Sequence, residues 1–418
     1  MPQFRGARGG LDTSVPVVVL GAGYGGLAVA RSLGRVGVPV YVVEARVGRP
    51  SLASRYWKKA FRWDLSTEQP HSSVEFLLDI GACIGNKGLI MPTTDVSALF
   101  VAEHAAELQA RFIISRQSAS LTRALLNKRE LHALLQRLGL PFARTAFPMS
   151  EQGLLEAVEE TGLPAIVKAI SPVVPPGKTK LFVKSRKEVL RLIAPAMVGH
   201  GNVLIQEYIP GGEDSNWFFD GYFNRQTRCL AAGTGQSIRR WSVHTGVASL
   251  AVSRPNRSVE KSSLTLAQAI GYQGLVDIDF RHDRRTGEYK IVDVNPRIGA
   301  AFRLFLTRDG RDLATVCYMD MTGQPVPVVE PLEGRKWWLE EDIFSSLRDR
   351  RERDLTFLAW VRSLAGVQEA AWFAVDDLAP FCGWLQSHLG SSLNVLTRQL
   401  TVGRKAGSGS HGRTANYV

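Results

Sequence analysis

The chain has 418 residues, of which 45% are apolar and 22% charged, and its formal net charge is +12 at pH 7. This length leaves room for two or three domains, and the composition is ordinary for a globular protein with a large buried core. The positive charge favours a polyanionic partner such as nucleic acid, an anionic membrane surface or phosphate groups in a cleft, and charge alone does not choose among them.

The four cysteines lie far apart and form no C-x-x-C pair: Cys83, Cys229, Cys317 and Cys382. This spacing indicates reduced thiols and argues against a disulfide framework or a zinc site. Residues 1–14, an expected flexible leader, lack the apolar segment of a signal peptide, and no apolar stretch approaches the ~20 residues that span a bilayer. We therefore expect a cytoplasmic protein without stable membrane insertion.

Residues 15–120 alternate short β-branched runs with helical patterns, which predicts a parallel α/β sheet. In the first run, VVVLGAGYGG, residues Gly21, Gly23 and Gly26 fit G-x-G-x-x-G, and Glu44 ends the next apolar run. These features are nearly the full dinucleotide fingerprint. A FAD- or NAD-dependent oxidoreductase is therefore one hypothesis, although we find no further glycine-rich cofactor contacts downstream.

A helical pattern from Leu121 ends at Gly139, before Pro141, and opens a second region over residues 121–330. Its helices and β-like runs predict an α+β architecture with antiparallel strands. Residues 331–402 are expected to be mostly helical, and the basic, Gly/Ser-rich residues 403–418 to be disordered. The Trp-bearing stretch from Trp384 to Leu396 is interpreted as a helix docked on the core, and a membrane-surface helix is the alternative.

Carboxylates and an amide cluster in the segment VDIDFRHDRRTGEYKIVDVNPR. Two strands joined by a turn at Thr286 and Gly287 would bring Asp279, Asp293 and Asn295 together, because a hairpin aligns its strands and residues i and i+2 share a face. Carboxylate and amide oxygens suit Mg²⁺, which takes few protein ligands alongside substrate phosphates. The alternative is an ordinary surface hairpin, but acids in runs that otherwise read as buried need partners. Arg297, just beyond, is suited to phosphoryl oxygens.

Two lysines interrupt apolar patterns. Lys168 lies in AIVKAI, an otherwise core-like strand, and Lys128 breaks a helical apolar stripe. A strand lysine beneath a turn suits a nucleotide phosphate. For each lysine taken alone, a snorkelling side chain is the competing interpretation.

Together these motifs resemble the ATP-grasp superfamily in its carboxylate–amine ligase branch. The resemblance rests on VDIDF followed by DVNPR, the strand lysine before a turn, the helix lysine in LLNKRELHALLQRLGLP, and IQEYIPGGED, and it covers about residues 121–325. SRYWKK at residues 54–59 and MPTTD at residues 91–95 resemble the N-terminal domain of that branch. The implied fold is a Rossmann-like N-terminal (pre-ATP-grasp) domain, a two-lobed ATP-grasp domain with a lid lobe over about residues 141–210, and a mostly helical C-terminal segment.

The resemblance implies a role for each matching residue. The residues implied to contact ATP are Lys128 and Lys168 at the phosphates, Gln206 with the backbone of Glu207, Tyr208 and Ile209 at the adenine, and Glu213 at the ribose. Asp279, Asp293 and Asn295 would hold Mg²⁺. Arg297 would steady the transferred phosphoryl group, with Arg239 or Arg240 near the γ-phosphate or the substrate carboxylate.

The implied activity is ATP- and Mg²⁺-dependent activation of a carboxylate as an acyl phosphate, which an amine then attacks. The expected partners are ATP and small carboxylate and amine substrates, with no nucleic acid, and a homodimer is left open. Two features depart from the pattern. The loop SPVVPPGKTK has a single glycine where many relatives have a glycine-rich flap, for which Lys178 and Lys180 would compensate. Asp279 and Asp293 stand where relatives often have Glu or Gln.

Overall fold

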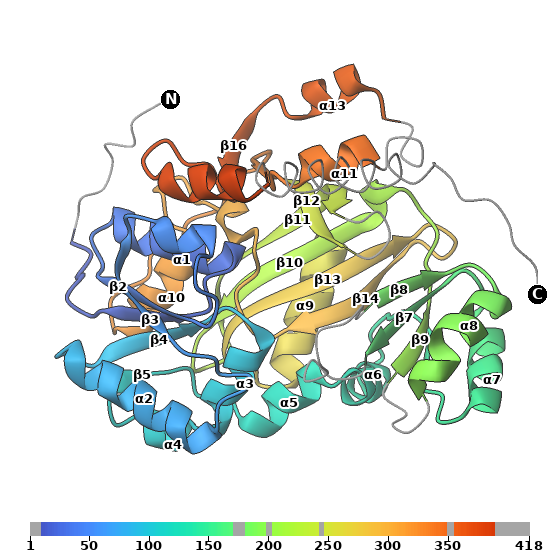
Figure 1. Ribbon diagram of the computed structural model, residues 1–418, viewed down its shortest axis with the longest axis horizontal. Helices are drawn as coiled ribbons and strands as arrows, with labels where there is room; N and C mark the ends of the chain where they lie inside the picture. Colours follow the sequence, from blue (N-terminus) through green and yellow to red (C-terminus); the bar gives the residue numbers. More distant parts are fainter. Residues whose placement is uncertain (1–9, 170–179, 198–202, 242–245, 349–354, 389–418) are drawn as a thin grey trace, which may run out of the picture.

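The structure is a computed structural model that describes residues 10–169, 180–197, 203–241, 246–348 and 355–388 (Figure 1). It contains three sheets, of five, seven and four strands. In Figure 1 the five-stranded sheet lies at one end, the seven-stranded sheet at the centre and the four-stranded sheet at the other end. The predicted combination of α/β and α+β parts is confirmed.

The N-terminal sheet is parallel and has the strand order β3-β2-β1-β4-β5. Its strands are β1 (Val17–Leu20), β2 (Val40–Glu44), β3 (Trp57–Arg62), β4 (Gly88–Pro92) and β5 (Phe112–Ile113). Its helices are α1 (Tyr24–Arg35), α2 (Pro70–Cys83), α3 (Asp95–Glu103) and α4 (Ala105–Leu108). The strand order reverses between β1 and β4, so the glycine turn after β1 and the start of α3 lie at the crevice where such sheets bind ligands.

The central sheet has the order β14-β13-β10-β11-β12-β15-β16 and is antiparallel apart from the last pair. Its strands are β10 (Asn216–Phe223), β11 (Cys229–Trp241), β12 (Val247–Ser253), β13 (Gly274–Asp283), β14 (Glu288–Asn295), β15 (Lys336–Trp338) and β16 (Val367–Ala370). The helices that accompany it are α5 (Ala119–Leu126), α6 (Lys128–Arg137), α9 (Arg257–Ala269) and α10 (Leu313–Met321).

The lid sheet has the order β6-β9-β7-β8. Its strands are β6 (Thr145–Ala146), β7 (Ala165–Ala169), β8 (Lys180–Val183) and β9 (Val203–Glu207), and its helices are α7 (Glu151–Thr161) and α8 (Arg186–Met197). Strand β7 lies between two antiparallel neighbours. Lys168 is therefore held in the interior of a sheet.

The C-terminal segment carries α11 (Asp342–Arg348), α13 (Phe357–Ser363) and a helix over 379–388. It also supplies β15 and β16, which extend the central sheet and were not predicted. Trp384 is buried and donates from Nε1 to Glu341 at 3.1 Å, as expected for a docked helix. Leu396 and the tail 403–418 lie outside the described residues.

Part of the predicted flexible leader is attached to the core. Residues 10–14 are described, and the backbone N–H of Asp12 donates to Gln324 Oε1 at 2.8 Å. Tyr318 on α10 in turn donates to the carbonyl of Asp12 at 3.0 Å. Within the described residues, none of the helices has the length and apolar character needed to cross a bilayer.

Strand β10 separates two hydrophobic cores because its side chains alternate between faces. Phe218 and Tyr222 pack with residues of the N-terminal region and α10, whereas Phe219 and Phe223 pack with α6 and α9 on the other side. Asp220 falls on the same face as Phe218 and Tyr222, in the middle of an apolar row. This face of the central sheet borders the candidate site.

Candidate functional site

Five polar side chains form two rows across the central sheet. In the first row Asp279 lies opposite Asp293. In the second row Asp277 lies between Asp220 on β10 and Asn295 on β14. The hairpin therefore brings together Asp279, Asp293 and Asn295, as its turn signals predicted. The sequence analysis missed Asp220 and Asp277, although the alternation in NWFFDGYF and VDID places both acids on the same face as the predicted ones.

The first row lies against lysines from three elements. Lys128, the first residue of α6, donates to Asp293 Oδ1, and Lys180 Nζ on β8 lies 3.8 Å from Asp293 Oδ2. Burial raises the pKa of Asp293, but the charges of Lys128, Lys180 and Lys168 outweigh it and hold that pKa well below its usual range. Asp293 is therefore a carboxylate at neutral pH.

Lys168 is the most perturbed cation of this group. Its ammonium donates to the backbone carbonyl of Val292 at 3.1 Å, and the side chain is buried. Burial, followed by repulsion from Lys180 and Lys128, lowers its pKa to about 7, with Asp293 opposing part of that effect. A buried, incompletely neutralised lysine favours a bound anion.

The rows and lysines border one cavity of about 410 Å³. Its charged and amide-bearing lining comprises Asp95, Lys128, Lys168, Lys180, Asp220, Arg240, Asp277, Asp279, Asp293, Asn295 and Arg297. A smaller adjoining cavity shares Lys168, Lys180, Arg240, Asp279 and Asp293 with it. The two cavities therefore adjoin at these residues between the lid sheet and the central sheet, and together they are called the groove below.

The adjoining cavity contains the four residues expected at the adenine, Gln206, Glu207, Tyr208 and Ile209. Gln206 donates to Thr145 Oγ1 at 3.0 Å, and Arg144 and Lys290 bind the carboxylate of Glu207 at 3.0 and 3.2 Å. That carboxylate is therefore occupied, and the backbone N–H of Glu207 also donates to the carbonyl of Arg144 at 2.9 Å. Glu213 begins a short 3-10 turn, η2 (Glu213–Ser215), and its side chain lies outside what the structure describes.

The two arginines of GQSIRRW separate clearly. Arg240 lines the cavity and donates to Asn216 Oδ1 at 2.8 Å. Arg239 is buried elsewhere and donates to Asp342 Oδ2 at 2.6 Å. Side chains alternate between the two faces of a strand, so Arg239 and Arg240 point to opposite faces of β11. The pairing of β11 with β12 is also irregular on both sides of Arg239. The expectation that Arg239 could serve the site is therefore corrected: it anchors the C-terminal segment.

Arg297 joins the N-terminal region to the second row. Its Nη1 donates to Asp277 at 2.9 Å and its Nε to Asp95, the first residue of α3, at 3.2 Å. Burial opposes its charge, but Asp277 and Asp95 raise the pKa of Arg297 above its usual range. Burial, followed by the charge of Asp279, raises the pKa of Asp277 to about 7. The N-terminal region thus contributes Asp95 to the site, a contact that the sequence did not predict.

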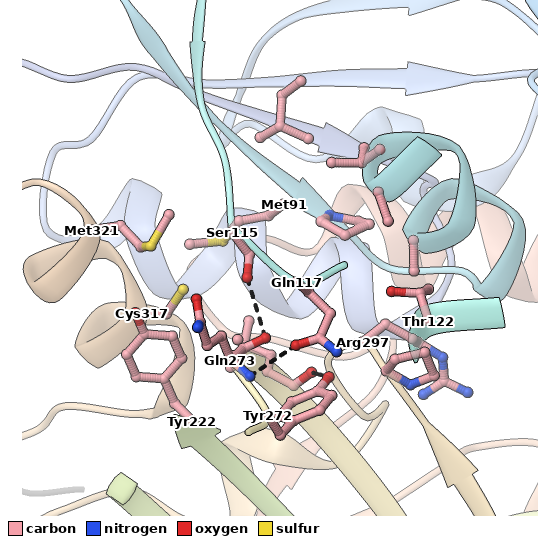
Figure 2. Close-up of a pocket in the computed structure, with 18 of the residues that line it drawn as sticks. Met91, Ser115, Gln117, Thr122, Tyr222, Tyr272, Gln273, Arg297, Cys317 and Met321 are labelled. Atoms are coloured by element: carbon pink, nitrogen blue, oxygen red, sulfur yellow. Dashed lines mark hydrogen bonds between the residues drawn. The ribbon is translucent and has the colours of Figure 1, made fainter. Parts of the chain in front are cut away.

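A third, mostly apolar cavity of about 60 Å³ lies beside Arg297, between β4, α10 and the start of β13 (Figure 2). Gln117 accepts from the backbone N–H of Gln273 at 2.9 Å. Gln117 Nε2, Thr122 Oγ1 and Gln273 Oε1 are buried without hydrogen-bond partners in the described residues. The volume is large enough for several water molecules, which would satisfy these atoms.

The glycine turn is occupied by the chain itself. The backbone N–H groups of Ala22 and Arg46 donate to the carboxylate of Glu44 at 2.7 and 3.0 Å. In a dinucleotide site that acid binds a ribose hydroxyl instead. At Gly26, a Cβ would lie 2.1 Å from the carbonyl oxygen of Gly21, so this glycine permits close packing of helix on strand. The strand, turn and helix are as predicted, and the acid of the fingerprint supports the turn.

The donor atoms of the first row and Asn295 suit Mg²⁺. The amide N–H of Asn295 donates to Asp277 Oδ2 at 3.3 Å, which leaves the amide oxygen of Asn295 able to bind a metal ion. Two carboxylates and an amide oxygen are hard donors of the kind that Mg²⁺ takes together with waters and phosphates. Among the described residues, no three histidine, cysteine or carboxylate side chains are grouped to hold a metal. Two carboxylates and one amide oxygen leave coordination positions that waters and phosphates fill at a typical Mg²⁺ site.

Comparisons with known proteins bear on the family and the fold of the chain. No family model matches the chain. D-aspartate ligase of Enterococcus faecium (strain Aus0004) is 24% identical over 241 residues, which cover 54% of this chain and 57% of that protein. The matched region is therefore less than two thirds of that relative.

Two solved structures share the architecture. N5-carboxyaminoimidazole synthetase from Staphylococcus aureus, complexed with ADP, has a TM-score of 0.62 at 14% identity, covering 82% of this chain and 87% of that one. The biotin carboxylase domain of Hydrogenobacter thermophilus 2-oxoglutarate carboxylase, complexed with MgADP and bicarbonate, has a TM-score of 0.58 at 15% identity, covering 75% and 72%. At these identities the likeness shows the fold.

Proposed function

This chain belongs to the ATP-grasp superfamily, and from that premise we propose that it is an ATP- and Mg²⁺-dependent ligase that joins a carboxylate to an amine. One observation carries the proposal. Lys128, Lys168 and Lys180 from three elements converge on the Asp279–Asp293 row, where all five residues line the larger of the two cavities of the groove. Positive charge for phosphates and oxygen donors for a metal are thus set side by side.

The groove divides into parts with distinct tasks. The backbone of Glu207–Ile209 would bind the adenine, and the lysines would bind the phosphates. Asp279, Asp293 and Asn295 would hold Mg²⁺, which offsets phosphate charge when bound. Lys128 now pairs with Asp293. When magnesium and ATP bind, Asp293 would contact the metal and Lys128 would contact a phosphate, so these two contacts would replace the internal ion pair.

Arg240 and Arg297 both line the cavity, and we assign them to the reacting groups. A guanidinium keeps its charge and can bind two phosphoryl or carboxylate oxygens at once. These residues would hold the substrate carboxylate while it accepts the phosphoryl group of ATP, and would stabilise the charge that develops. An amine would then attack the acyl phosphate, a course that needs no covalent protein nucleophile. The resemblance to D-aspartate ligase supports an amino-acid or peptide-like substrate pair.

The test follows ADP release from MgATP in the presence of hydroxylamine, which traps acyl phosphates as coloured hydroxamates. A panel of amino acids and short peptides supplies the carboxylate. We expect one or more carboxylates to give both ADP and hydroxamate. Asp293→Asn should abolish both products because it removes a charged magnesium ligand, whereas Asp376→Asn, which weakens partly exposed contacts with Arg35 and Tyr56 away from the cavity, should retain them. Absence of ATP binding and of ADP release with every carboxylate would refute the proposal.

The oxidoreductase hypothesis has no supporting contact in the described residues, since the carboxylate of Glu44 is bound within the turn. It has its own check. The purified protein should show no flavin absorbance in the near-ultraviolet and blue, and bound flavin would reverse the ranking.

A further inference from the structure

Asp220 is a buried carboxylate without a partner. It lies on β10 and is 1% exposed, yet neither of its carboxylate oxygens has a hydrogen-bond partner among the described residues. It lines the large cavity beside Phe218. A carboxylate in such surroundings is unfavourable unless a cation or a donor binds it.

The neighbourhood of Asp220 carries excess negative charge. Asp277 lies opposite it on β13, and Asp95 and Asp277 both bind Arg297. Three carboxylates therefore surround one guanidinium. Burial, followed by the charge of Asp277, raises the pKa of Asp220 well above its usual range, and a bound cation would favour its ionised form.

The chain also makes room for this carboxylate. A Cβ at Gly299 would lie 2.3 Å from Asp220 Oδ1, inside contact distance. Gly299 lines the same cavity, two residues beyond Arg297. A glycine here allows the backbone that follows Arg297 to approach Asp220 without displacing it.

We propose that Asp220, supported by the charge of Asp277, binds the ammonium group of the second substrate, so that the nucleophile is a cationic amine. This inference rests on the proposed ligase function and adds the charge class of one substrate. Asp277 and Asp279 are two residues apart on one strand, a separation of about 7 Å. An ammonium at the second row therefore lies one side-chain repeat from the proposed magnesium ligands and next to Arg297.

The reaction balances with this substrate. The amine nitrogen forms a bond to the acyl carbon, the bond from that carbon to the phosphate oxygen breaks, and phosphate leaves. Of the two protons that the nitrogen loses, one goes to the phosphate and one to solvent. The same row disfavours an anionic nucleophile such as bicarbonate, the anion present in the solved biotin carboxylase complex.

The test is the Asp220→Asn variant, which keeps the shape and removes the charge. Amino acids serve as amines, bicarbonate as the anionic alternative, and hydroxylamine, uncharged at pH 7.5, as a neutral nucleophile. We expect the KM for the amine to rise about 10- to 100-fold, the range for losing a charged hydrogen-bond partner. Hydroxamate formation should stay within about threefold of wild type, because activation of the carboxylate does not use Asp220.

Two further variants sharpen the result. Gly299→Ala should reproduce the rise in the amine KM, because its methyl group displaces Asp220. Asp320→Asn is the matched control. Asp320 accepts a hydrogen bond at 2.7 Å from Tyr222, which shares the face of β10 with Asp220, but Asp320 does not line the cavity, so the KM for the amine should stay unchanged. Thermal unfolding of each variant confirms that it is folded.

The outcomes separate the two proposals. No hydroxamate from the wild type with any carboxylate refutes the ligase function itself. Three results would overturn the ammonium site while the wild type still forms hydroxamate. They are a preference for bicarbonate over amines as the nucleophile, an unchanged amine KM in Asp220→Asn, and an equal loss of hydroxamate and of amide product in that variant. A raised Mg²⁺ requirement with an unchanged amine KM would make the second row a metal site and would also overturn it.

Discussion

Replacing Lys168 with methionine should make the protein more stable and less able to bind ATP. Methionine has a similar length and no charge, so it fills the space of the lysine in β7. Lys168 is buried beside two other lysines, and this environment lowers its pKa from 10.5 to about 7. The folded protein therefore holds a cation that would be better solvated in the unfolded chain.

The size of the effect follows from that difference in pKa. At about 1.4 kcal/mol per pKa unit, lowering the pKa of Lys168 from 10.5 to about 7 corresponds to roughly 4 to 5 kcal/mol of destabilisation near neutral pH. The variant also loses the hydrogen bond to Val292, which costs about 1 kcal/mol. Relaxation of the groove reduces the gain further. We expect Lys168→Met to raise the free energy of unfolding by about 2 to 3 kcal/mol at pH 6.5.

The sign can be checked through pH. Between pH 7 and about 10 the unfolded chain keeps a proton on Lys168 that the folded protein has released, so wild-type stability gains from rising pH in this window. The variant lacks that contribution. Its advantage should therefore be largest below pH 7 and should disappear towards pH 10.5, the ordinary lysine pKa.

Urea unfolding of both proteins at several pH values, with calorimetric titration of MgATP, measures both effects. MgATP affinity should fall at least about tenfold in the variant, as for the loss of a charged phosphate contact. At pH 8 the wild type should also take up a proton on binding MgATP, because phosphates raise the pKa of Lys168. A less stable variant at pH 6.5, or a stability difference independent of pH, would refute the reasoning.

Four further variants test the assignments at the site and at the glycine turn. Arg239→Met should lower the free energy of unfolding by about 3 kcal/mol, because it leaves Asp342 buried without its main partner. Arg240→Met should instead lower kcat/KM about 100-fold with little change in Tm. Urea unfolding and ADP release distinguish the two variants, and the reverse pattern would contradict the assignment of Arg239 to the fold and Arg240 to the site. Gly26→Ala should cost about 2 to 4 kcal/mol in urea unfolding through the clash with the backbone at Gly21, and an unchanged midpoint would mean that the turn is not close-packed. Glu44→Gln should cost about 1 kcal/mol with unchanged ADP release; a loss of turnover at equal stability would point to a ligand at the glycine turn.

The fold could be predicted because its signals are local. Alternating β-branched runs with helical patterns predict a parallel sheet, and the turn at Thr286 and Gly287 predicts the hairpin. The pairing of Asp279 with Asp293 also depends on a register shift between Asp279 and Phe280, which the turn alone does not predict. The short strands β15 and β16 gave no such signal. They are 3 and 4 residues long, and what makes them strands is their pairing with a distant sheet edge.

Much of the site depends on tertiary contacts that no short pattern contains. Adjacent arginines at 239 and 240 look alike in the sequence, and only the irregular pairing of β11 decides which one reaches the groove. Asp95 joins the site because Arg297, 202 residues later, reaches back to it. Glu44 fits a cofactor fingerprint, and its role changes because the backbone of the turn already binds it.

The groove combines interactions that stabilise the fold with groups that do not. Glu207, Arg239 and Glu44 each have strong partners within the chain and act as supports. Lys168 and Asp220 are buried without enough compensation: burial and neighbouring lysines lower the pKa of Lys168, whereas burial and neighbouring acids raise the pKa of Asp220, which accepts no hydrogen bond within the described residues. An uncharged residue could replace either of them with little loss of stability, so their presence is explained best by ligands of opposite charge. On this reasoning the lid side of the groove binds an anion and the second row binds a cation, which is the charge pattern that a phosphate donor and an amine acceptor require.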